Sequence, residues 1–342
     1  MRPPQNRNRA GKATLVDIAQ RAGVSTITAS RALHGGLPVA EATRARILAA
    51  ADDLGYTPNL LARGLVQNRT STIGVIIIEI ANPFFAPMVS AVETVAAKRG
   101  FLVVVGESAR NPEWERQYVD RFQQLRVGGI IVTPALTQAN HLAVARAAGT
   151  PVVVMSRRWL GGDYVTADNL AGGRLAAQHL LSRGHRRIGL VAPDHPLDTS
   201  FRDRIQGFRE TLTSAGMSVP APWELRTKAT GIEDGVEAAN GILALRRRPS
   251  AIFATTDREA MGLIQSLLAH GVRVPEDIAV VGYDDIPFAA CSQVPLTTVK
   301  IPVWQIGELA AEVLFDRMDG RRPEKRQRML LSPELVVRAS SP

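Results

Sequence analysis

Residues 25 to 31 gather hydroxyls, a guanidinium and an aliphatic side chain on one short stretch. If the stretch is helical, its outward face consists of Thr26, Ile27, Thr28, Ser30 and Arg31. Hydroxyl and guanidinium groups can hydrogen-bond phosphates and guanine edges, and an exposed aliphatic group can contact a thymine methyl. These residue types therefore predict a surface suited to the major groove of a DNA duplex.

The chain around this stretch carries the signals of a tight turn between two helices. Ile18 and Ala22 share one helical face, Gly23 lets the backbone turn, Val24 fills the corner, and Ser25 can cap the next helix. The second helix is expected to bury Ala29, Ala32 and Leu33. The expected helices are Leu15 to Ala22, Ser25 to Leu33 and Glu41 to Leu54. A helix-turn-helix fits these signals, and an ordinary helical hairpin is the alternative.

Basic charge is concentrated at the start of the chain. Residues 1 to 70 hold ten Lys and Arg against four acids, a net charge of +6, whereas the whole chain of 342 residues carries +9. The remaining residues therefore carry only +3. This distribution favours a small unit that neutralises phosphates, joined to a larger unit with another task.

The rest of the chain alternates apolar runs with segments of helical length. The runs cover residues 73–80, 101–106, 128–133, 151–156, 187–192, 251–256 and 278–283. Continuous apolar strands that alternate with helices indicate parallel sheets buried on both faces. Seven strands over this length fit two successive doubly wound lobes, with a ligand cleft at the carboxyl ends of the strands.

Polar and aromatic residues just after the strands are the candidate ligand contacts. Phe84 and Phe85 follow the first run, and two aromatic rings there can stack on a sugar or a base, although core packing explains them equally well. Arg157 follows the fourth run, and Asp257 and Asp284 follow two later ones.

Several other classes of protein are excluded by what the sequence lacks. One cysteine, Cys291, allows no internal disulfide or thiolate zinc cluster, and the six histidines are scattered, so no metal and no cofactor is expected. Nucleotide-binding and nucleophile-elbow motifs of common enzymes are missing. No apolar run is long enough for a membrane span, and the first residues have no export signal. We expect a cytoplasmic binding protein rather than an enzyme or a periplasmic solute-binding protein.

The order of several motifs resembles the lactose/galactose repressor (LacI/GalR) family of bacterial transcriptional regulators. The motifs are T-L-x-D-I-A-x-x-A-G-V-S-x-x-T-x-S-R from Thr14, G-Y-x-P-N-x-x-A-R-x-L from Gly55, T-x-x-I-G-V from Thr70, V-G-Y-D-D from Val281 and P-L-T-T-V from Pro295. The resemblance implies an all-α helix-turn-helix DNA-binding domain and an α/β two-lobed domain of the type I periplasmic-binding-protein kind.

The resemblance also implies roles for the first unit. Thr26, Ile27 and Arg31 match the base-reading positions of the family. The positions that hold phosphates match Ser25, Thr28 and Ser30, and those of the minor-groove hinge match Asn59, Ala62 and Leu65. Leu65 is the expected wedge at the operator centre, with a plain linker leucine as the alternative.

For the cleft, the resemblance implies contacts to a small effector. The expected contacts are Phe84, Phe85, Arg157, Ser200, Arg204, Thr256, Asp257 and Asp284. A guanidinium opposite a carboxylate suits a saccharide, although Arg204 and Asp284 could instead form an ion pair that bridges the lobes. Thr256 replaces the usual asparagine, so the effector stays open among a sugar, a sugar acid and a sugar phosphate, with a nucleobase less favoured.

The expected domain limits follow from these assignments. They are a flexible basic arm at 1–13, the helix-turn-helix at 14–58, a hinge helix and linker at 59–70, and the two-lobed domain at 71–342. Lobe 1 is expected at about 71–168 and 301–329, and lobe 2 at about 169–300 and 330–342. Because no heptad tail follows Arg338, we expect a homodimer rather than a tetramer on double-stranded operator DNA.

Two departures from the family pattern affect packing rather than contact with DNA. Ala29 and Ala32 stand where bulkier residues are usual, so the second helix is expected to pack less tightly. Ala40 stands where a capping serine is usual, which is expected to weaken the third helix by roughly 1 kcal/mol.

Overall fold

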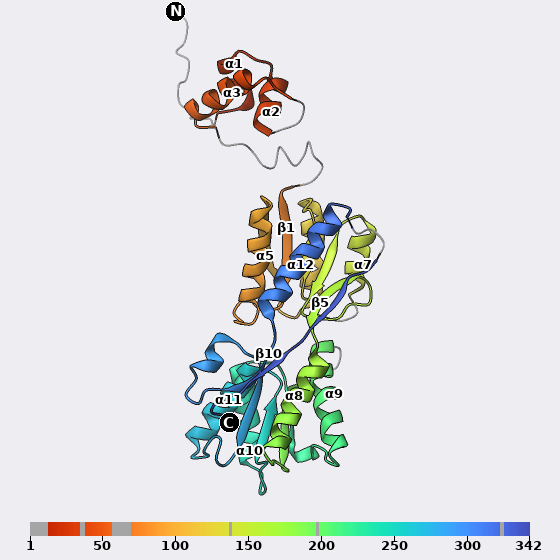
Figure 1. Cartoon of the computed structure of the whole chain (residues 1–342), viewed down its shortest axis with the longest axis vertical. Coiled ribbons are helices and arrows are strands. Elements are labelled where there is room, and N and C mark those ends of the chain that lie inside the picture. Colours follow the sequence, from red (N-terminus) through yellow and green to blue (C-terminus); the bar gives the residue numbers. More distant parts are fainter. Residues whose placement is uncertain (1–12, 35–37, 57–69, 137–138, 196–197, 322–324) are drawn as a thin grey trace, which may run out of the picture. The chain divides into compact units, whose positions relative to one another are not determined.

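The computed structural model describes residues 13–34, 38–56, 70–136, 139–195, 198–321 and 325–342. The chain divides into two compact units, Met1–Thr70 and Ser71–Pro342. Figure 1 shows the helices and strands of both units.

The described part of the first unit is helical. Its helices are α1 (Leu15–Ala22), α2 (Thr26–His34) and α3 (Glu41–Asp53). They enclose a small core in which Ile18, Ala29 and Ile47 are fully buried. The prediction of an all-helical first unit is therefore confirmed, and its helices end within a residue of the expected limits.

Across its described residues, the second unit forms two sheets, each of six strands. The first sheet has the strand order β11-β5-β4-β3-β1-β2, and all its neighbouring strands are parallel. Its strands are β1 (Thr72–Ile77), β2 (Leu102–Glu107), β3 (Ile130–Val132), β4 (Val152–Met155), β5 (Asp163–Ala167) and β11 (Arg328–Leu331). Its helices are α5 (Ala86–Lys98), α6 (Pro112–Gln124), α7 (Asn140–Ala147) and α12 (Val303–Met318).

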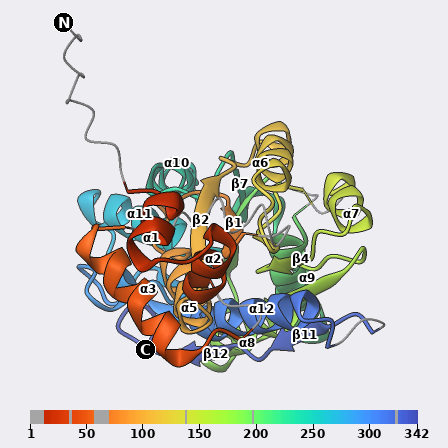
Figure 2. The ribbon, with the colours of Figure 1, turned by 90° about the horizontal axis from the view of Figure 1, so that it is seen from above.

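Helices cover both faces of this first sheet. Alternate strand residues point to opposite faces, and the two cores divide in that way. Val75 and Val153 share a core with Met88 of α5 and Leu314 of α12. Residues whose side chains point to the other face, such as Val154, share a second core with α6 and α7. Figure 2 shows α5 and α12 side by side, with α6 across the sheet from them.

The second sheet repeats this design in the order β12-β10-β9-β8-β6-β7. Its strands are β6 (Ile188–Pro193), β7 (Glu224–Thr227), β8 (Ala251–Ala254), β9 (Ala279–Asp284), β10 (Thr297–Lys300) and β12 (Glu334–Val336), and only β10 and β12 pair antiparallel. Its helices are α8 (Asn169–Ser182), α9 (Thr199–Ser214), α10 (Ile232–Leu243) and α11 (Asp257–Ala269). The short 3-10 helices are η1 (Ala221–Trp223) and η2 (Pro287–Ala290).

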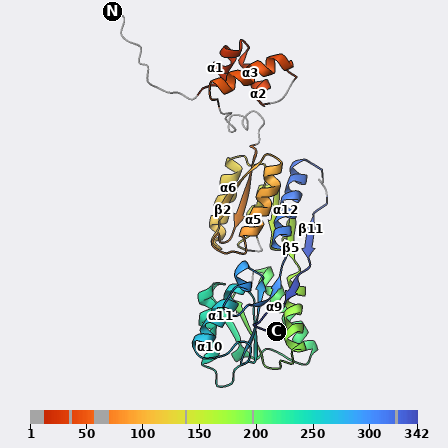
Figure 3. The same ribbon diagram turned by 60° about the vertical axis from the view of Figure 1, so that its left-hand side comes forward.

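The two sheets define two lobes, and the chain passes between them where β5 leads to α8, β10 leads to α12 and β11 leads to β12. Figure 3 shows the last of these passages, with β11 beside β5 in the first sheet. The predicted two-lobed α/β fold is confirmed. Each of the seven apolar runs coincides with a strand to within one residue at the ends where the strand extends beyond it, whereas β5, β7, β10, β11 and β12 were not predicted because their sequences are short and mixed in polarity.

Candidate functional site

The turn between α1 and α2 is built from local hydrogen bonds. Thr14 caps α1 in a reciprocal capping box with Asp17, and Gly23 ends it with a φ of +63°. The amide of Val24 donates to the carbonyl of Ala19 over 3.0 Å. Ser25 then starts α2, since its hydroxyl accepts from the amide of Thr28 over 3.2 Å. A left-handed glycine and a serine cap therefore fix where the second helix begins.

The two faces of α2 have different environments. Ala29 and Ala32 are buried against α1 and α3. On the other side, Thr26, Ile27 and Arg31 are exposed, and Ile27 keeps 62% of its surface accessible. An aliphatic residue so exposed beside a guanidinium contributes nothing to the core. The three predicted base-reading residues thus share one free surface.

The predicted phosphate-binding residues lie at the start of α2 and along its side. The hydroxyls of Ser25 and Thr28 are 2.9 Å apart, and Ser30 is half-buried. As expected, Ala40 gives α3 no side-chain cap. The predicted hinge residues Asn59, Ala62 and Leu65 lie outside the described residues.

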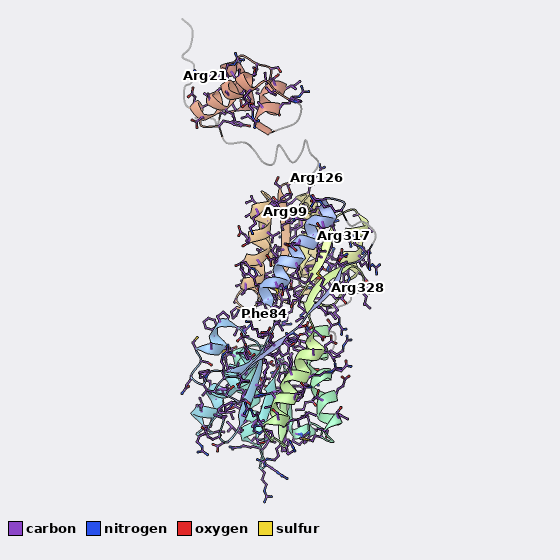
Figure 4. The ribbon with its side chains drawn as sticks, viewed as in Figure 1. Arg21, Phe84, Arg99, Arg126, Arg317 and Arg328 are labelled. Carbon is purple, nitrogen blue, oxygen red and sulfur yellow. The ribbon has the colours of Figure 1, made fainter. Side chains whose placement is uncertain are left out.

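In the second unit, a small cavity lies between the lobes, with a volume of about 40 Å³. Both lobes line it, with Ile78, Asn82, Phe84, Phe85, Arg110, Thr133, Ser156 and Arg157 from lobe 1 and Asp198, Ser200, Phe201, Arg204, Thr230, Thr256 and Asp284 from lobe 2. Figure 4 shows Phe84 where the two lobes meet. A liquid water takes up about 30 Å³, so the lobes are closed on their own side chains.

Arg204 is the most heavily bonded of the predicted effector contacts. Its Nε donates to Asn169 Oδ1 over 3.0 Å, and its Nη1 donates to the carbonyl of Thr255 over 2.6 Å. Its Nη2 lies 3.0 Å from Asp284 Oδ1, and its guanidinium carbon lies 3.8 Å from the centre of the Tyr283 ring. All these partners belong to lobe 2, so the ion pair of Arg204 and Asp284 does not bridge the lobes.

Asp284 ends β9 in an unusual environment. Burial raises its pKa to about 6, although the nearby Arg204 guanidinium acts in the opposite direction. Its backbone φ is +118°, and Ser156, which follows β4, has a φ of +65°. Non-glycine residues seldom adopt such angles, and strained backbone of this kind gathers at ligand sites. Both residues line the cavity.

Arginine and carboxylate pairs link the lobes around the cavity. Arg157 of lobe 1 donates to Asp198 at the start of α9, and neighbouring Arg158 donates to Asp203. Ser200, a predicted contact, donates its hydroxyl to the carbonyl of Ser156 over 3.0 Å. These contacts join the end of β4 to the first turns of α9.

Two further links lie nearby. Arg110 Nη2 donates to Thr230 Oγ1 over 3.1 Å, and Arg258 of lobe 2 pairs with Glu79 of lobe 1. Arg110, Thr133 and Asp198 were absent from the predicted contacts. Thr133 directly follows β3, so the rule that predicted Arg157 would have found it.

The two phenylalanines of the aromatic pair lie where the cavity meets the core. Phe84 and Phe85 line the cavity and also belong to the main core, with their rings 5.0 Å apart and nearly perpendicular. Thr256 lines the cavity too, and its hydroxyl caps α11 and donates to Glu259 Oε2 over 2.9 Å.

Asp257, another predicted effector contact, lies away from the cavity. This residue is fully buried, does not line the cavity, and accepts hydrogen bonds from Thr298 Oγ1 and from the amide of Ile286. Its place in the first turn of α11 directs the carboxylate toward β10 and the loop after β9. Burial and the charge of Asp284 raise its pKa, and its hydrogen bonds to Thr298 and Ile286 are made within lobe 2.

Comparisons with known proteins match two separate parts of the chain to two family models. Residues 14–59 match the model of bacterial regulatory proteins of the lacI family, and residues 177–341 match that of a periplasmic binding protein-like domain. The HTH-type transcriptional repressor PurR of Photobacterium profundum is 36% identical over 334 residues, which cover 96% of this chain and 98% of the relative. The chain belongs to the LacI family.

Other LacI-family proteins match over almost the whole chain. The ribose operon repressor of Escherichia coli K12 is 35% identical over 333 residues, covering 96% of this chain and all of the relative. The solved lac repressor dimer bound to operator and the anti-inducer ONPF has a TM-score of 0.87 at 27% identity, covering 97% and 99% of the two chains. The solved complex of the regulator CelR with cellobiose has a TM-score of 0.73 at 32% identity, covering 96% and 99%.

These relatives of the LacI-family chain are transcriptional regulators rather than enzymes. Within the described residues, no group of three or more His, Cys, Asp or Glu side chains is placed to hold a metal ion. In the same part of the chain, no helix combines the length and the apolarity that crossing a membrane requires.

Proposed function

We propose that this LacI-family chain is a repressor that binds a near-palindromic operator as a homodimer and responds to a sugar or sugar derivative in the cleft between its lobes. The exposed face of α2 carries the proposal. Thr26, Ile27 and Arg31 are free of the helical core, and together they offer a hydroxyl, an aliphatic group and a fork of donors to base edges. The family relatives that are repressors support the same role.

The dimer is supported by the free edge of the first sheet. β2 is an edge strand, and its residues Leu102, Val104 and Val105 expose 60%, 40% and 37% of their surface. Exposed apolar residues on an unpaired edge strand favour association with another chain. A similar protein, the lac repressor, has been solved as a dimer on its operator. Two chains would present two α2 helices to two half-sites.

The proposed effector site is the cavity that the two lobes share. A ligand there contacts both lobes at once, so its binding changes how they are set and thereby the affinity for the operator. Arg204 and Asp284 provide donors and an acceptor for hydroxyls, and Phe84 and Phe85 provide an apolar wall. A similar protein, the regulator CelR, has been solved in complex with cellobiose, which supports a saccharide as the class of effector.

The DNA-binding half of the proposal is tested by selecting duplexes from a random pool with the full chain. The selected site should be a near-palindrome, and Arg31→Ala should lower affinity for it about 10- to 100-fold, as expected for the loss of a bidentate contact to a base. Arg21→Ala is the matched control, because Arg21 is also exposed but pairs with Asp53 on α3. Equal operator affinities of Arg31→Ala and wild type would contradict the assignment.

A further inference from the structure

Two buried side chains of lobe 1 line the cavity and each carries a donor atom that has no hydrogen-bond partner among the described residues. Arg157 is 4% exposed and Thr133 is 1% exposed. Within the described part of the chain, neither Arg157 Nη1 nor Thr133 Oγ1 has a hydrogen-bond partner. An unsatisfied buried donor destabilises the fold, so a ligand that brings acceptor oxygens to this wall gains free energy.

The same wall carries more positive than negative charge. Arg157 and Arg110 share one carboxylate, Asp198, which accepts from Arg157 Nη2 and lies 4.0 Å from Arg110. Glu79, the other carboxylate that acts on Arg110, is already paired with Arg258. Burial and the like charge of Arg157 lower the pKa of Arg110. Among the described residues that line the cavity, three guanidiniums (Arg110, Arg157 and Arg204) thus face two carboxylates (Asp198 and Asp284) in a partly desolvated place, which favours an added anion.

The wall contributed by lobe 2 offers a hydrogen-bond acceptor. Asp284 Oδ1 is buried, and its ion-pair partner among the described residues is the Arg204 guanidinium, whose Nη2 lies 3.0 Å away. A carboxylate oxygen in this state accepts a hydrogen bond from a ligand hydroxyl. The cavity therefore offers donors and positive charge on lobe 1 and an acceptor on lobe 2.

We infer that the effector is an anionic polyol, with its carboxylate or phosphate bound by Arg110, Thr133 and Arg157 of lobe 1 and a hydroxyl donating to Asp284 of lobe 2. This inference rests on the proposed function of the cleft. A sugar acid and a sugar phosphate share the required chemistry. Since the cavity measures only about 40 Å³, either ligand enters after the lobes separate and then replaces part of their mutual contact.

Calorimetry on the full chain tests the inference with charged and neutral probes of matched size. The probes are gluconate, glucuronate, glucose 6-phosphate and ribose 5-phosphate, against neutral glucose and ribose. Wild type should bind at least one charged probe ten-fold or more tightly than its neutral parent. Carboxylate probes and phosphate probes then distinguish the two sources of the anion.

Variants locate the anionic group. Arg157→Gln should abolish the preference for the charged probe, and so should Arg110→Gln, which disturbs a less buried residue. Arg158→Gln is the control, because Arg158 also pairs across the lobes, with Asp203, but does not line the cavity. It should keep the preference. Asp284→Asn should weaken charged and neutral probes alike, five-fold or more, without changing their ratio.

The possible failures differ from one another. Equal affinity for charged and neutral probes, or a preference that survives both Arg157→Gln and Arg110→Gln, would overturn the inference and leave the proposed sugar sensor intact. Binding of none of the probes would overturn the inference together with the proposed role of the cleft. Operator binding by α2 would stand in either case.

Discussion

The guanidinium of Arg258 in lobe 2 lies 2.9 Å from both carboxylate oxygens of Glu79 in lobe 1. Both side chains are partly exposed, so the pair contributes roughly 0.5–1 kcal/mol. The two residues are 179 positions apart in the sequence. Together with Arg157 and Asp198, this pair holds the two lobes against each other.

Glu79→Gln should let the lobes separate more readily. The expected effect is a two- to five-fold faster hydrogen exchange in peptides that cover the cavity walls around Thr133 and Thr256, because about 0.5–1 kcal/mol of closure is lost. Glu113→Gln is the control, since Glu113 pairs with Arg116 inside α6. Unchanged exchange in Glu79→Gln would show that this pair does not hold the cleft closed.

Ile27→Ala should separate DNA binding from stability. Ile27 is 62% exposed on α2, so its truncation should change the stability of the first unit by less than about 0.5 kcal/mol. Operator affinity should nevertheless fall several-fold, through loss of an apolar contact with a thymine methyl. Fluorescence anisotropy and thermal denaturation measure the two effects.

Val16→Ala provides the comparison for Ile27→Ala. Val16 is 53% exposed but lies on α1, so this variant should alter neither quantity. If Ile27→Ala bound the operator as tightly as Val16→Ala, Ile27 would have no part in reading DNA.

Gly207→Ala should disturb the cleft by forcing apart the two helices α8 and α9. A Cβ at Gly207 would lie 2.0 Å from the carbonyl oxygen of Leu170, so α8 and α9 would have to move apart. Because α9 carries Ser200 and Arg204, we expect a loss of about 1–3 kcal/mol in stability and weaker binding of the preferred probe. Thermal denaturation and calorimetry measure both.

Gly241→Ala on α10 is the milder counterpart, since its Cβ would meet the movable end of the Leu225 side chain. Wild-type stability and probe affinity in Gly207→Ala would mean that the close approach of α8 and α9 is not needed to place Arg204.

Glu259 should make stability depend on pH. Burial raises its pKa from 4.5 to about 7, although Thr227, Thr256 and Thr255 donate hydrogen bonds to it. The folded chain therefore holds a proton that the unfolded chain has lost, and stability falls as pH rises from about 4.5 to about 7. One pKa unit corresponds to about 1.4 kcal/mol, so the loss approaches about 3 kcal/mol.

Glu259→Gln keeps the shape of the side chain and removes its titration. Relative to wild type it should gain Tm at pH 8 and gain little at pH 5, because the wild-type carboxyl is protonated in the folded state at the lower pH. The same Tm difference at both pH values would show that Glu259 does not titrate in this range.

Much of the fold could be predicted, because long apolar runs have few alternatives to buried strands. The missed strand β5 shows the limit of that rule. It begins with Asp163, which is buried because Arg317 of α12 donates to both of its oxygens over 2.8 and 2.9 Å. A charged residue in a buried strand is tolerated only with such a partner, and the partner lies 154 positions away.

The position of the cleft was predicted, but not all of the residues that line it. Polar residues after parallel strands were expected to face it, and Arg157 and Asp284 do so. The same rule did not hold for Asp257. The first turn of α11 directs its carboxylate toward β10 and the loop after β9, away from the cavity. The rule was also silent on Asp198, whose position depends on how α9 begins.

The sequence by itself determined where α1 and α2 begin and how the chain turns between them, since Thr14, Gly23 and Ser25 act through hydrogen bonds to neighbours at most five positions away. Such local contacts form wherever the spacing is kept. Only the tertiary structure decided which charges meet in the cleft. Arg157 reaches Asp198 across 41 positions, and Arg110 reaches Thr230 across 120. Pairs so far apart form only after two sheets and three passages of the chain have set the lobes against each other.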